Sequence, residues 1–239
     1  IRHETPMQGA TGNCWLVSIA SALAALDPTS LKRLITAHQD GTYTVTFQRY
    51  DSISQAYCPE KVRVDGRLYR GREGVVYGTS DGKQGPQSLE MWWPILEKAY
   101  AKWKGSYDAI EWGYGHEAFE SLLGAQGQQI QFDAAGKEKV RQILTQSQSQ
   151  KRPTFVTTRH QKPNQLNRKG LVDDHAYTFL GLEEVKGETK VTLRNPWGQF
   201  EPVGDGVDDG VFTLSFDDFM TYFVSAAVGP SLCKPADKL

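Results

Sequence analysis

The sequence has few cysteines, and their number excludes one class of protein. Only three occur in 239 residues, at Cys14, Cys58 and Cys233. Small secreted domains that depend on disulfides carry more of them, usually in even numbers. An odd count leaves at least one thiol unpaired within the chain, and a pairing of Cys58 with Cys233 stays open. No Cys/His spacing matches a zinc site, so we expect no bound metal of that kind.

Long hydrophobic runs and an excess of one charge are also absent. No stretch approaches the roughly 20 apolar residues that a membrane-spanning helix needs, so we expect no span. The 27 Lys and Arg nearly balance the 28 Asp and Glu, giving a net charge of −1. This balance argues against a nucleic-acid partner bound through bulk positive charge. Aromatic residues are plentiful instead, with 6 Trp, 10 Tyr and 10 Phe to build a large core.

The order of expected elements indicates an α+β chain in two subdomains. For the first half, the patterns predict two helices, two strands and a hairpin turn, at 14–26, 89–104, 42–47, 61–64 and Asp65-Gly66. For the second half they predict mainly strands, at 154–158, 176–182, 190–194, 211–214 and 224–228. We therefore expect a helical subdomain at 1–112 and a β-rich subdomain at 113–239, with a cleft between them.

The segment from Gln8 to Trp15 surrounds Cys14 with features that activate a thiol. Gly12 and Asn13 form a turn and cap signal that places Cys14 in the first turn of a helix. There the unpaired N–H groups and the helix dipole favour an anion, which predicts a lowered thiol pKa. A side-chain N–H of Gln8, together with the N–H of Cys14, would form an oxyanion hole. The alternative interpretation is a buried cysteine that only packs in the core.

Among the five histidines, His175 has the most informative setting. It opens a strand of alternating apolar residues, directly after the polar loop 161–172. A hairpin through 184–188 would pair this strand with the one that ends before Asn195 and bring Asn195 near His175. An Asn oxygen that accepts from the ring N–H fixes the imidazole orientation, and Trp197 would shield that bond from water. The alternative is a capping Asn and a core Trp.

Cys14, His175 and Asn195 follow each other in the order of papain-like thiol hydrolases, where Asn holds the Cys–His pair. The segments around them resemble the protease core of the calpain family. The resemblance covers Gln8-Gly-x-x-Gly-x-Cys-Trp15, the helix from Leu96 to Lys102, Gly170 to Tyr177, Leu193 to Gly198, and Asp209 to Phe219. These matches are collinear and span nearly the whole chain.

The resemblance implies a papain-like fold and endopeptidase activity on protein substrates. It implies Cys14 as the nucleophile, His175 as the base, Asn195 as the residue that orients the base, and Gln8 as an oxyanion-hole donor. Two other functions stay open. One is an acyltransferase or amidase that uses the same triad on side-chain amides of proteins. The other is a catalytically inactive calpain-like binding module, against which the intact set of four residues argues.

The expected substrate contacts are Gly113, Asp174 and Trp197. Calpains carry Gly immediately before the catalytic His, where it contacts the substrate backbone, whereas this chain has Asp174. That departure predicts a changed geometry beside the nucleophile or a changed substrate preference. The loop 161–172 corresponds to a segment that gates the cleft in the family.

The resemblance also raises the question of calcium, which the family binds through acidic segments. The stretch 199–210 is shorter than its counterpart and lacks a Trp found there, and Thr5-Pro6-Met7 contains no acid. Glu201, Asp208 and Asp209 are either remnants of a calcium site, since carboxylate oxygens suit calcium, or solvated loop acids. We expect a protease core that needs neither calcium nor another cofactor.

The start of the chain bears on where the protein acts. Ile1 to Gln8 is polar and has neither the basic nor the apolar segment of a signal peptide. We therefore expect an intracellular, cytoplasmic location, or delivery to a cytoplasm as part of a larger effector protein. The sequence leaves the oligomeric state open.

Overall fold

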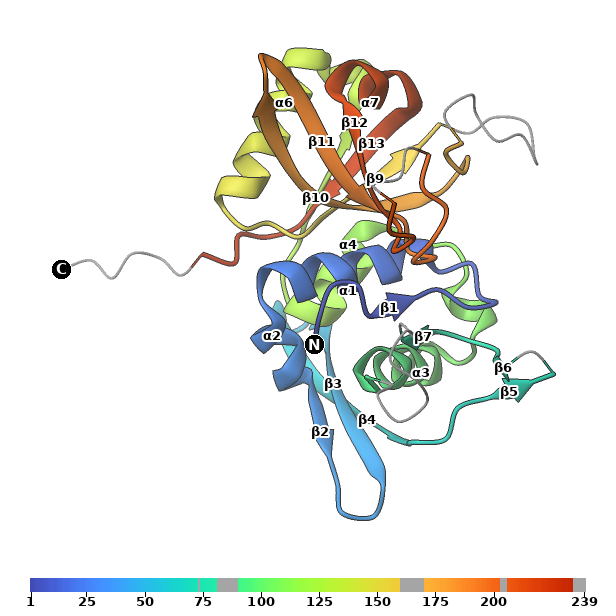
Figure 1. Ribbon diagram of the computed structural model, residues 1–239. Coiled ribbons are helices and arrows are strands. Elements are labelled where there is room, and N and C mark those ends of the chain that lie inside the picture. Colours follow the sequence, from blue (N-terminus) through green and yellow to red (C-terminus); the bar gives the residue numbers. More distant parts are fainter. Residues whose placement is uncertain (73, 81–89, 160–169, 203–205, 234–239) are drawn as a thin grey trace.

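Two parts of the molecule lie one above the other in the computed structural model (Figure 1). It describes residues 1–72, 74–80, 90–159, 170–202 and 206–233. The lower part in this view contains α1 to α4 and a long hairpin, and we call it the helical part. The upper part is built on a six-stranded sheet, and we call it the sheet part. The predicted gating loop, 161–172, lies outside the described residues except for 170–172.

A buried helix, α1 (Cys14–Leu26), forms the middle of the helical part. Its sequence is rich in Ala and Leu and contains no Gly or Pro, and every residue from Trp15 to Ala24 is buried. A helix that is apolar all round has to be covered on all sides. Asp27 ends α1 and caps α2 (Pro28–Leu34) by accepting two backbone N–H groups, with Pro28 in the first position. The predicted helix at 14–26 is confirmed.

A three-stranded antiparallel sheet extends below the helices. It consists of β2 (Ile35–Ala37), β3 (Thr42–Asp51) and β4 (Ala56–Asp65), in that order. The predicted turn at Asp65-Gly66 is wrong, because Asp65 pairs with Thr42 at the opposite end of the hairpin. The strands turn at 52–55 instead, where the Asp51 carboxylate accepts two backbone N–H groups. Such an Asx turn ends a strand through its own side chain, without a glycine.

The second long helix, α3 (Trp92–Lys104), begins three residues later than its sequence pattern predicts. Pro94 lies in its first turn, where the missing N–H is tolerated. The remaining elements of this part are short: β1 (Pro6–Met7), β5 (Arg70–Gly71), β6 (Gly74–Val75), β7 (Thr79–Ser80), η2 (Asp108–Ile110) and α4 (Gly115–Leu123). β1 pairs with β7, which places the chain just before Gln8 beside Thr79 and Ser80.

The sheet part has the strand order β12-β11-β10-β9-β13-β8, and all neighbouring pairs are antiparallel. Its strands are β8 (Gln128–Gln131), β9 (Thr154–Thr158), β10 (Ala176–Val185), β11 (Glu188–Arg194), β12 (Val211–Ser215) and β13 (Phe223–Val228). Its helices are α5 (Phe132–Ala135), α6 (Lys137–Ser149) and α7 (Phe216–Tyr222). The five predicted strands are confirmed. The sequence gives no sign of β8, because this edge strand is mostly glutamine.

The buried apolar residues form two clusters. The first joins α1, α3 and β3, and it also includes Phe155 and Ala176 of the sheet, so α1 packs directly against the sheet part. The second lies between the sheet and α5, α6 and α7. Ala118 and Phe119 of α4 belong to the first cluster. The division of the chain at 112 and 113 stays a prediction.

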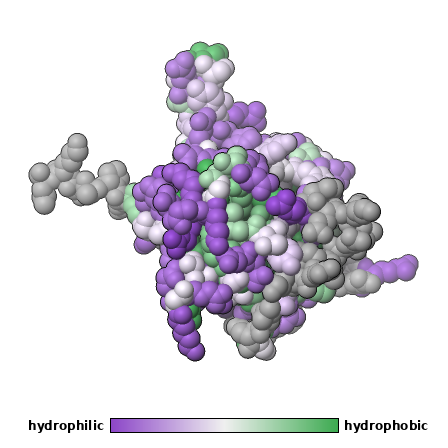
Figure 2. All heavy atoms as spheres, turned by 90° about the horizontal axis from the view of Figure 1, so that it is seen from above, coloured by the Kyte–Doolittle hydropathy of each residue, from purple (hydrophilic) through white to green (hydrophobic). Residues whose placement is uncertain are grey.

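The face of the molecule shown in Figure 2 is largely polar. Seen from above, hydrophilic residues surround a hydrophobic area in the middle of the view (Figure 2). Among the described residues no single helix is long and apolar enough to cross a membrane. α1 and α2 reach the required length only as a pair bent by 118°.

Candidate active site

Cys14 begins α1, as the sequence predicts. The carbonyl oxygen of Asn13 accepts the first helical hydrogen bonds, from Leu16 and Val17. The Asn13 side chain was expected to cap the helix, but no side-chain cap is formed. It is buried, and its Nδ2 donates to Oε1 of Glu97 at 2.7 Å. The residue before Cys14 is therefore held by α3 and not by its own helix.

Glu97 joins three segments beneath Cys14. Besides the bond from Asn13, its Oε2 accepts the backbone N–H of Gly78 at 2.7 Å. A Cβ at position 78 would lie 2.5 Å from Nε1 of Trp93, so only glycine fits there. Burial raises the pKa of Glu97 to about 7, and the two hydrogen bonds partly oppose this rise. The sequence analysis missed Glu97, although a lone acid on the apolar face of a helix is a usable signal.

The pKa of the Cys14 thiol differs from the sequence expectation. Burial raises it, and this effect exceeds the lowering by the backbone N–H groups of Ala176, Trp15 and Cys14. The nearby Asp174 charge raises it further. The prediction of a lowered pKa is therefore wrong, because the helix terminus faces the sheet part and not open water. In the resting site Cys14 is a neutral thiol.

His175 and Asn195 are brought together as the sequence predicts. His175 immediately precedes β10, Asn195 immediately follows β11, and these two strands are paired. His175 Nε2 lies 3.1 Å from Asn195 Oδ1, and both residues are buried. The Trp197 ring lies over the imidazole, with centroids 4.9 Å apart. Trp197 thus occupies the shielding position that the sequence predicts.

Burial lowers the pKa of His175 to about 4, although the hydrogen bond with Asn195 and the charge of Asp174 both oppose this change. At neutral pH the imidazole is therefore uncharged. With Nε2 directed at the Asn195 oxygen, Nδ1 is the nitrogen that is left to accept a proton. Both shifts favour the uncharged forms of Cys14 and His175 at neutral pH.

Two hydroxyl groups join α1 to the sheet one turn after Cys14. Ser18 Oγ donates to the carbonyl oxygen of Ala176 at 3.2 Å, and Thr178 Oγ1 donates to the carbonyl oxygen of Ser18 at 3.1 Å. These reciprocal bonds fix the start of β10, and with it His175, against the helix that begins at Cys14. The sequence analysis missed both residues. Their signal is a hydroxyl in the middle of an otherwise apolar helix or strand.

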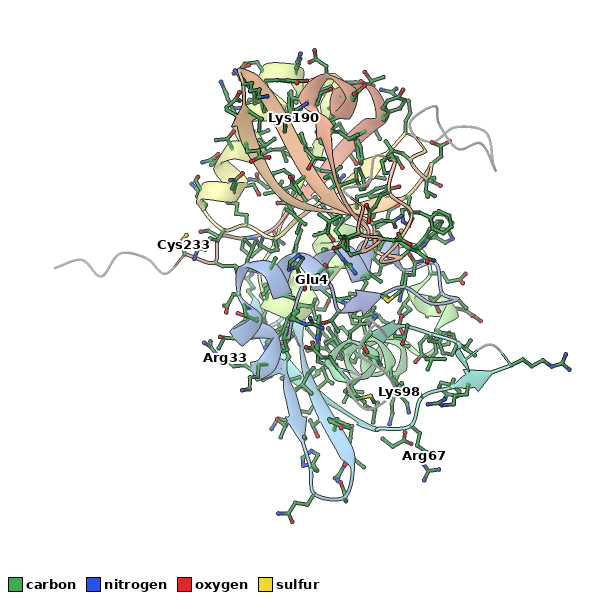
Figure 3. All side chains as sticks on the ribbon, in the orientation of Figure 1. Glu4, Arg33, Arg67, Lys98, Lys190 and Cys233 are labelled. Atoms are coloured by element: carbon green, nitrogen blue, oxygen red, sulfur yellow. The ribbon has the colours of Figure 1, made fainter. Side chains whose placement is uncertain are left out.

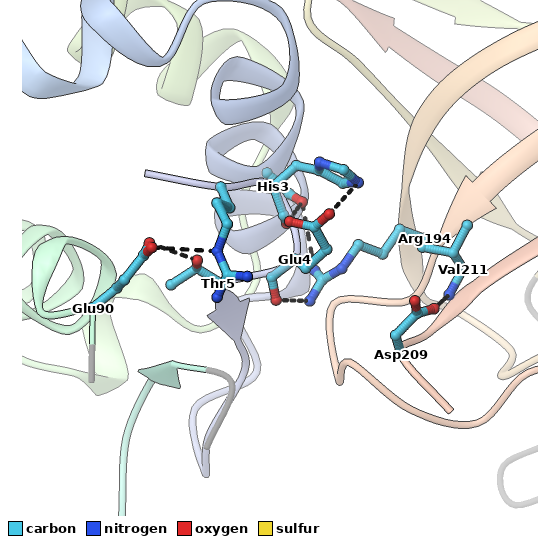
Figure 4. Close-up of polar contacts among 9 residues, drawn as sticks. His3, Glu4, Thr5, Glu90, Arg194, Asp209 and Val211 are labelled. Carbon is cyan, nitrogen blue, oxygen red and sulfur yellow. Dashed lines mark hydrogen bonds and ion pairs between the residues drawn. The ribbon is translucent and has the colours of Figure 1, made fainter. Parts of the chain in front are cut away.

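A buried arginine makes a second connection between the two parts (Figure 4). Arg194, the last residue of β11, donates from Nη2 to the carbonyl oxygen of Glu4 at 2.7 Å and from Nη1 to Ser21 Oγ at 3.4 Å. Figure 3 shows Glu4 at the junction of the two parts. Because Arg194 precedes Asn195, it ties the Asn195 strand to the N-terminal segment and to α1.

Gln8 lies beside both halves of the site. Its backbone N–H donates to the Pro196 carbonyl at 2.9 Å. Its side-chain Nε2 donates to Thr11 O at 2.8 Å, while Oε1 is buried and without a hydrogen-bond partner among the described residues. One N–H of the Gln8 side-chain amide is thus used within its own loop. A role as hydrogen-bond donor beside Cys14 depends on the second N–H of that amide. Gly9 is needed here because a Cβ would lie 2.3 Å from the Tyr77 carbonyl carbon.

A pocket of about 290 Å³ opens next to Cys14. It is lined by Cys14, Trp15, Trp112, Gly113, Tyr114, Gly115, Gln129, Gln131, Phe155, Thr157, Asp174, Ala176 and Ser225. Gly113 and Asp174, two of the predicted substrate contacts, are therefore in its wall, whereas Trp197 lies over His175. A Cβ at position 113 would lie 2.3 Å from the Trp15 ring, which explains the glycine. The exposed rings of Trp112 and Tyr114 flank it.

The other two cysteines lie away from this pocket. Cys58 and Cys233 are exposed and unpaired, so the open question of a disulfide between them is answered. Figure 3 shows Cys233 on the outer side of the molecule, near the C-terminus. Cys14 is half-buried. Its helix, α1, packs against β10, the strand that directly follows His175.

A family model described as calpain family cysteine protease matches residues 2–208. This match covers the helix that carries Cys14, the segment before β10 with His175, and the end of β11 with Asn195. The chain belongs to the calpain family of cysteine proteases. Its α+β fold of two subdomains is accordingly the papain-like fold of that family, and the predicted family and fold are confirmed.

Calpain relatives match nearly all of this chain. Human calpain-12 is 29% identical over 90% of the chain, human calpain-14 is 30% identical over 91%, and the chicken calpain-2 catalytic subunit is 29% identical over 90%. The chain spans only about a third of the length of these relatives, from 32% to 34%. The similarity therefore concerns one part of those proteins.

Proposed function

We propose that this calpain family member is a cysteine endopeptidase with Cys14 as nucleophile, His175 as general base and Asn195 as the residue that orients the base. The observation that carries this proposal is the 3.1 Å contact between His175 Nε2 and Asn195 Oδ1. That contact leaves Nδ1 free for the thiol, and His175 directly precedes β10, the strand that packs against the Cys14 helix. A pocket wide enough for a substrate side chain opens at the same place.

The chemistry starts from a neutral pair, since burial raises the pKa of the Cys14 thiol and lowers that of His175. His175 Nδ1 takes the thiol proton as the sulfur attacks the scissile carbonyl carbon. The imidazolium then gives this proton to the leaving amine as the C–N bond breaks. Water, deprotonated by His175, hydrolyses the thioester and releases the thiol.

The developing oxyanion needs two donors near Cys14. We assign one to the backbone N–H of Cys14 and the other to the second side-chain N–H of Gln8. The Gln8 backbone bond to Pro196 supports this assignment, because it holds the Gln8 segment against the Asn195 loop. Removing one such donor costs other hydrolases on the order of 10²-fold to 10³-fold in kcat.

Substrate binding is assigned to the pocket beside Cys14 and to the residues above His175. Gly113 offers its backbone to an extended peptide, and Asp174 places a negative charge at the same wall. Trp197 shields the His175–Asn195 contact from water. The exposed rings of Trp112 and Tyr114 provide an apolar rim for one side chain of the substrate.

Terminal-amine profiling of a cytosolic proteome tests the proposal. The proteome is incubated under reducing conditions with the wild-type protein, with Cys14→Ala and with Cys58→Ala, which removes an exposed thiol as a control. We expect new amino termini with the wild type and with Cys58→Ala, and none with Cys14→Ala. Termini shared by all three samples would reject the endopeptidase.

The same samples separate the other two functions. Deamidated or acylated glutamine side chains without new termini would identify an amidase or acyltransferase. A protein that produces neither change, yet retains partners from the same proteome, would be an inactive binding module.

A further inference from the structure

The loop that follows Asn195 folds back onto it. The Asn195 N–H donates to the Gly210 carbonyl at 2.8 Å, and Gly198 N–H donates to the Asn195 carbonyl at 2.9 Å. Asn195 Nδ2 donates to the Phe200 carbonyl at 3.3 Å. The amide that faces His175 with its oxygen is therefore held at its nitrogen by the loop. At its oxygen the same amide also accepts the backbone N–H of Trp197 at 3.1 Å, so the loop contacts both ends of the Asn195 side chain.

Glu201 closes this loop. Its Oε1 accepts the backbone N–H groups of Asp209 and Gly210, both at 2.8 Å. These two residues come eight and nine positions later, where the chain returns to β12. One carboxylate oxygen thus joins the outgoing and returning ends of the loop. A single side-chain oxygen of this kind has two lone pairs and can accept both N–H groups.

The neighbouring backbone needs such support. Phe200 has a φ of 64°, a left-handed conformation that is unfavourable for a residue with a Cβ. Gly210 has a φ of 82°, and a Cβ there would lie 2.9 Å from the Asn195 carbonyl oxygen. The close approach of the two ends thus depends on one glycine and one strained residue. The bonds to Glu201 hold Gly210 in place, and the Asp208 carboxylate accepts the N–H of Phe200.

The acids for which the sequence leaves open either a remnant calcium site or solvated loop acids are Glu201, Asp208 and Asp209, and their hydrogen bonds do not fit a calcium site. Glu201 Oε1 is directed at two N–H groups, Asp208 Oδ1 accepts Phe200 N–H, and Asp209 Oδ1 accepts Val211 N–H. Each carboxylate has an oxygen turned toward its own backbone rather than toward a shared centre. Within the described residues, no group of three or more His, Cys, Asp or Glu side chains is placed to hold a metal ion.

We propose that Glu201 is a positioning residue that holds Asn195 against His175 through backbone hydrogen bonds, without a bound cation. The inference rests on the proposed function, since it concerns the orientation of the base in that reaction. This role requires the acceptor oxygen of the residue 201 side chain and does not require its negative charge.

Two substitutions separate the acceptor from the charge. Glu201→Gln keeps an oxygen that accepts both N–H groups, and we expect kcat and KM close to those of the wild type. Glu201→Ala removes the acceptor, and we expect kcat to fall by roughly 10-fold to 100-fold with KM little changed. Glu188→Ala, on the exposed far end of the β10–β11 hairpin, is the matched control and should leave both constants unchanged. All four proteins are assayed with a chelator and with added calcium, which should make no difference.

Specific results would overturn the proposal. It is wrong if Glu201→Ala keeps the wild-type kcat, or if Glu201→Gln loses as much as Glu201→Ala. It is also wrong if the wild type loses activity with the chelator and regains it with calcium.

If the wild type cleaves no protein, the proposed function fails and a readout independent of activity decides on the loop. The amides of Asp209 and Gly210 should then be protected from hydrogen exchange in the wild type and in Glu201→Gln, and not in Glu201→Ala. Equal protection in all three proteins would reject the role of Glu201.

Discussion

The two halves of the candidate site are held in different ways. His175 and Asn195 flank one hairpin, 20 residues apart in the chain, and meet because β10 and β11 pair. Cys14 depends on contacts between distant segments, since Asn13 before it bonds to Glu97, 84 residues away. His175 and Asn195 thus form a local arrangement, whereas Cys14 is placed by contacts across the helical part.

Each half also contains a buried titratable group, and burial shifts the two pKa values in opposite directions. The pKa of Glu97 rises to about 7 and that of His175 falls to about 4, because burial disfavours the charged form of each. Glu97 contributes stability that is complete below pH 4.5 and is lost as the pH rises through about 7. His175 contributes stability that is present above pH 6.5 and is lost as the pH falls through about 4. The two halves therefore respond to pH with opposite signs.

We expect the largest loss of activity from a substitution at Cys14. Cys14→Ala should lower kcat/KM by roughly 10⁴-fold or more, because no other group can form the acyl-enzyme. The free energy of unfolding should hardly change, since the side chain is small and half-buried. Peptide hydrolysis and urea unfolding measure the two quantities. Residual activity of more than a few per cent would mean that Cys14 is not the nucleophile.

We expect a smaller loss of activity from a substitution at Asn195, beside the β10–β11 hairpin. Asn195→Ala should lower kcat by roughly 10-fold to 100-fold, because His175 remains on its strand and loses only its orienting partner. Steady-state kinetics with one peptide substrate gives the change. A loss as large as that of Cys14→Ala would contradict the view that this half is fixed by strand pairing.

Glu97→Gln tests how the segments around Cys14 are held together. A glutamine amide has one acceptor oxygen, so its NH₂ group would face one of two buried donors, Asn13 Nδ2 or Gly78 N–H. The substitution should cost about 1–3 kcal/mol of unfolding free energy at pH 4.5. The difference from the wild type should shrink as the pH rises to 7, because only the wild type carries the titrating group. Urea unfolding at several pH values measures this, with Glu188→Gln as the exposed control. A difference that does not vary with pH would show that the Glu97 pKa is not raised.

We expect the smallest effect from removing the negative charge of Asp174. Asp174 raises the pKa of both Cys14 and His175, so Asp174→Asn should lower both. The acid limb of kcat/KM, set by His175, should move to lower pH, and kcat at neutral pH should change little. A pH–rate profile of the two proteins gives the shift. An acid limb that moves to higher pH would contradict the electrostatic role of Asp174.

Local signals in the sequence predicted most of the elements, and one failure is instructive. The hairpin between β10 and β11 and the start of α1 follow from periodicity and turn residues. The turn of the β3–β4 hairpin was misplaced because Asp65-Gly66 is a stronger local signal than Asp51 with its polar neighbours. Which of two possible turns forms depends on the register of the paired strands, and here that register runs from Thr42–Asp65 to Asp51–Ala56.

Sequence motifs alone predict the family, the cysteine that begins a helix, and the pairing of His175 with Asn195. Each of these depends on residues close in the chain or on a motif with fixed spacing. The raised pKa of Cys14, the contact of Asn13 with Glu97 and the placement of Arg194 between the two parts emerge only when the chain is folded. The reason is physical: a hydrogen bond or a desolvated charge depends on what packs against it, and those groups come from distant segments. Periodicity within one segment contains no information about them.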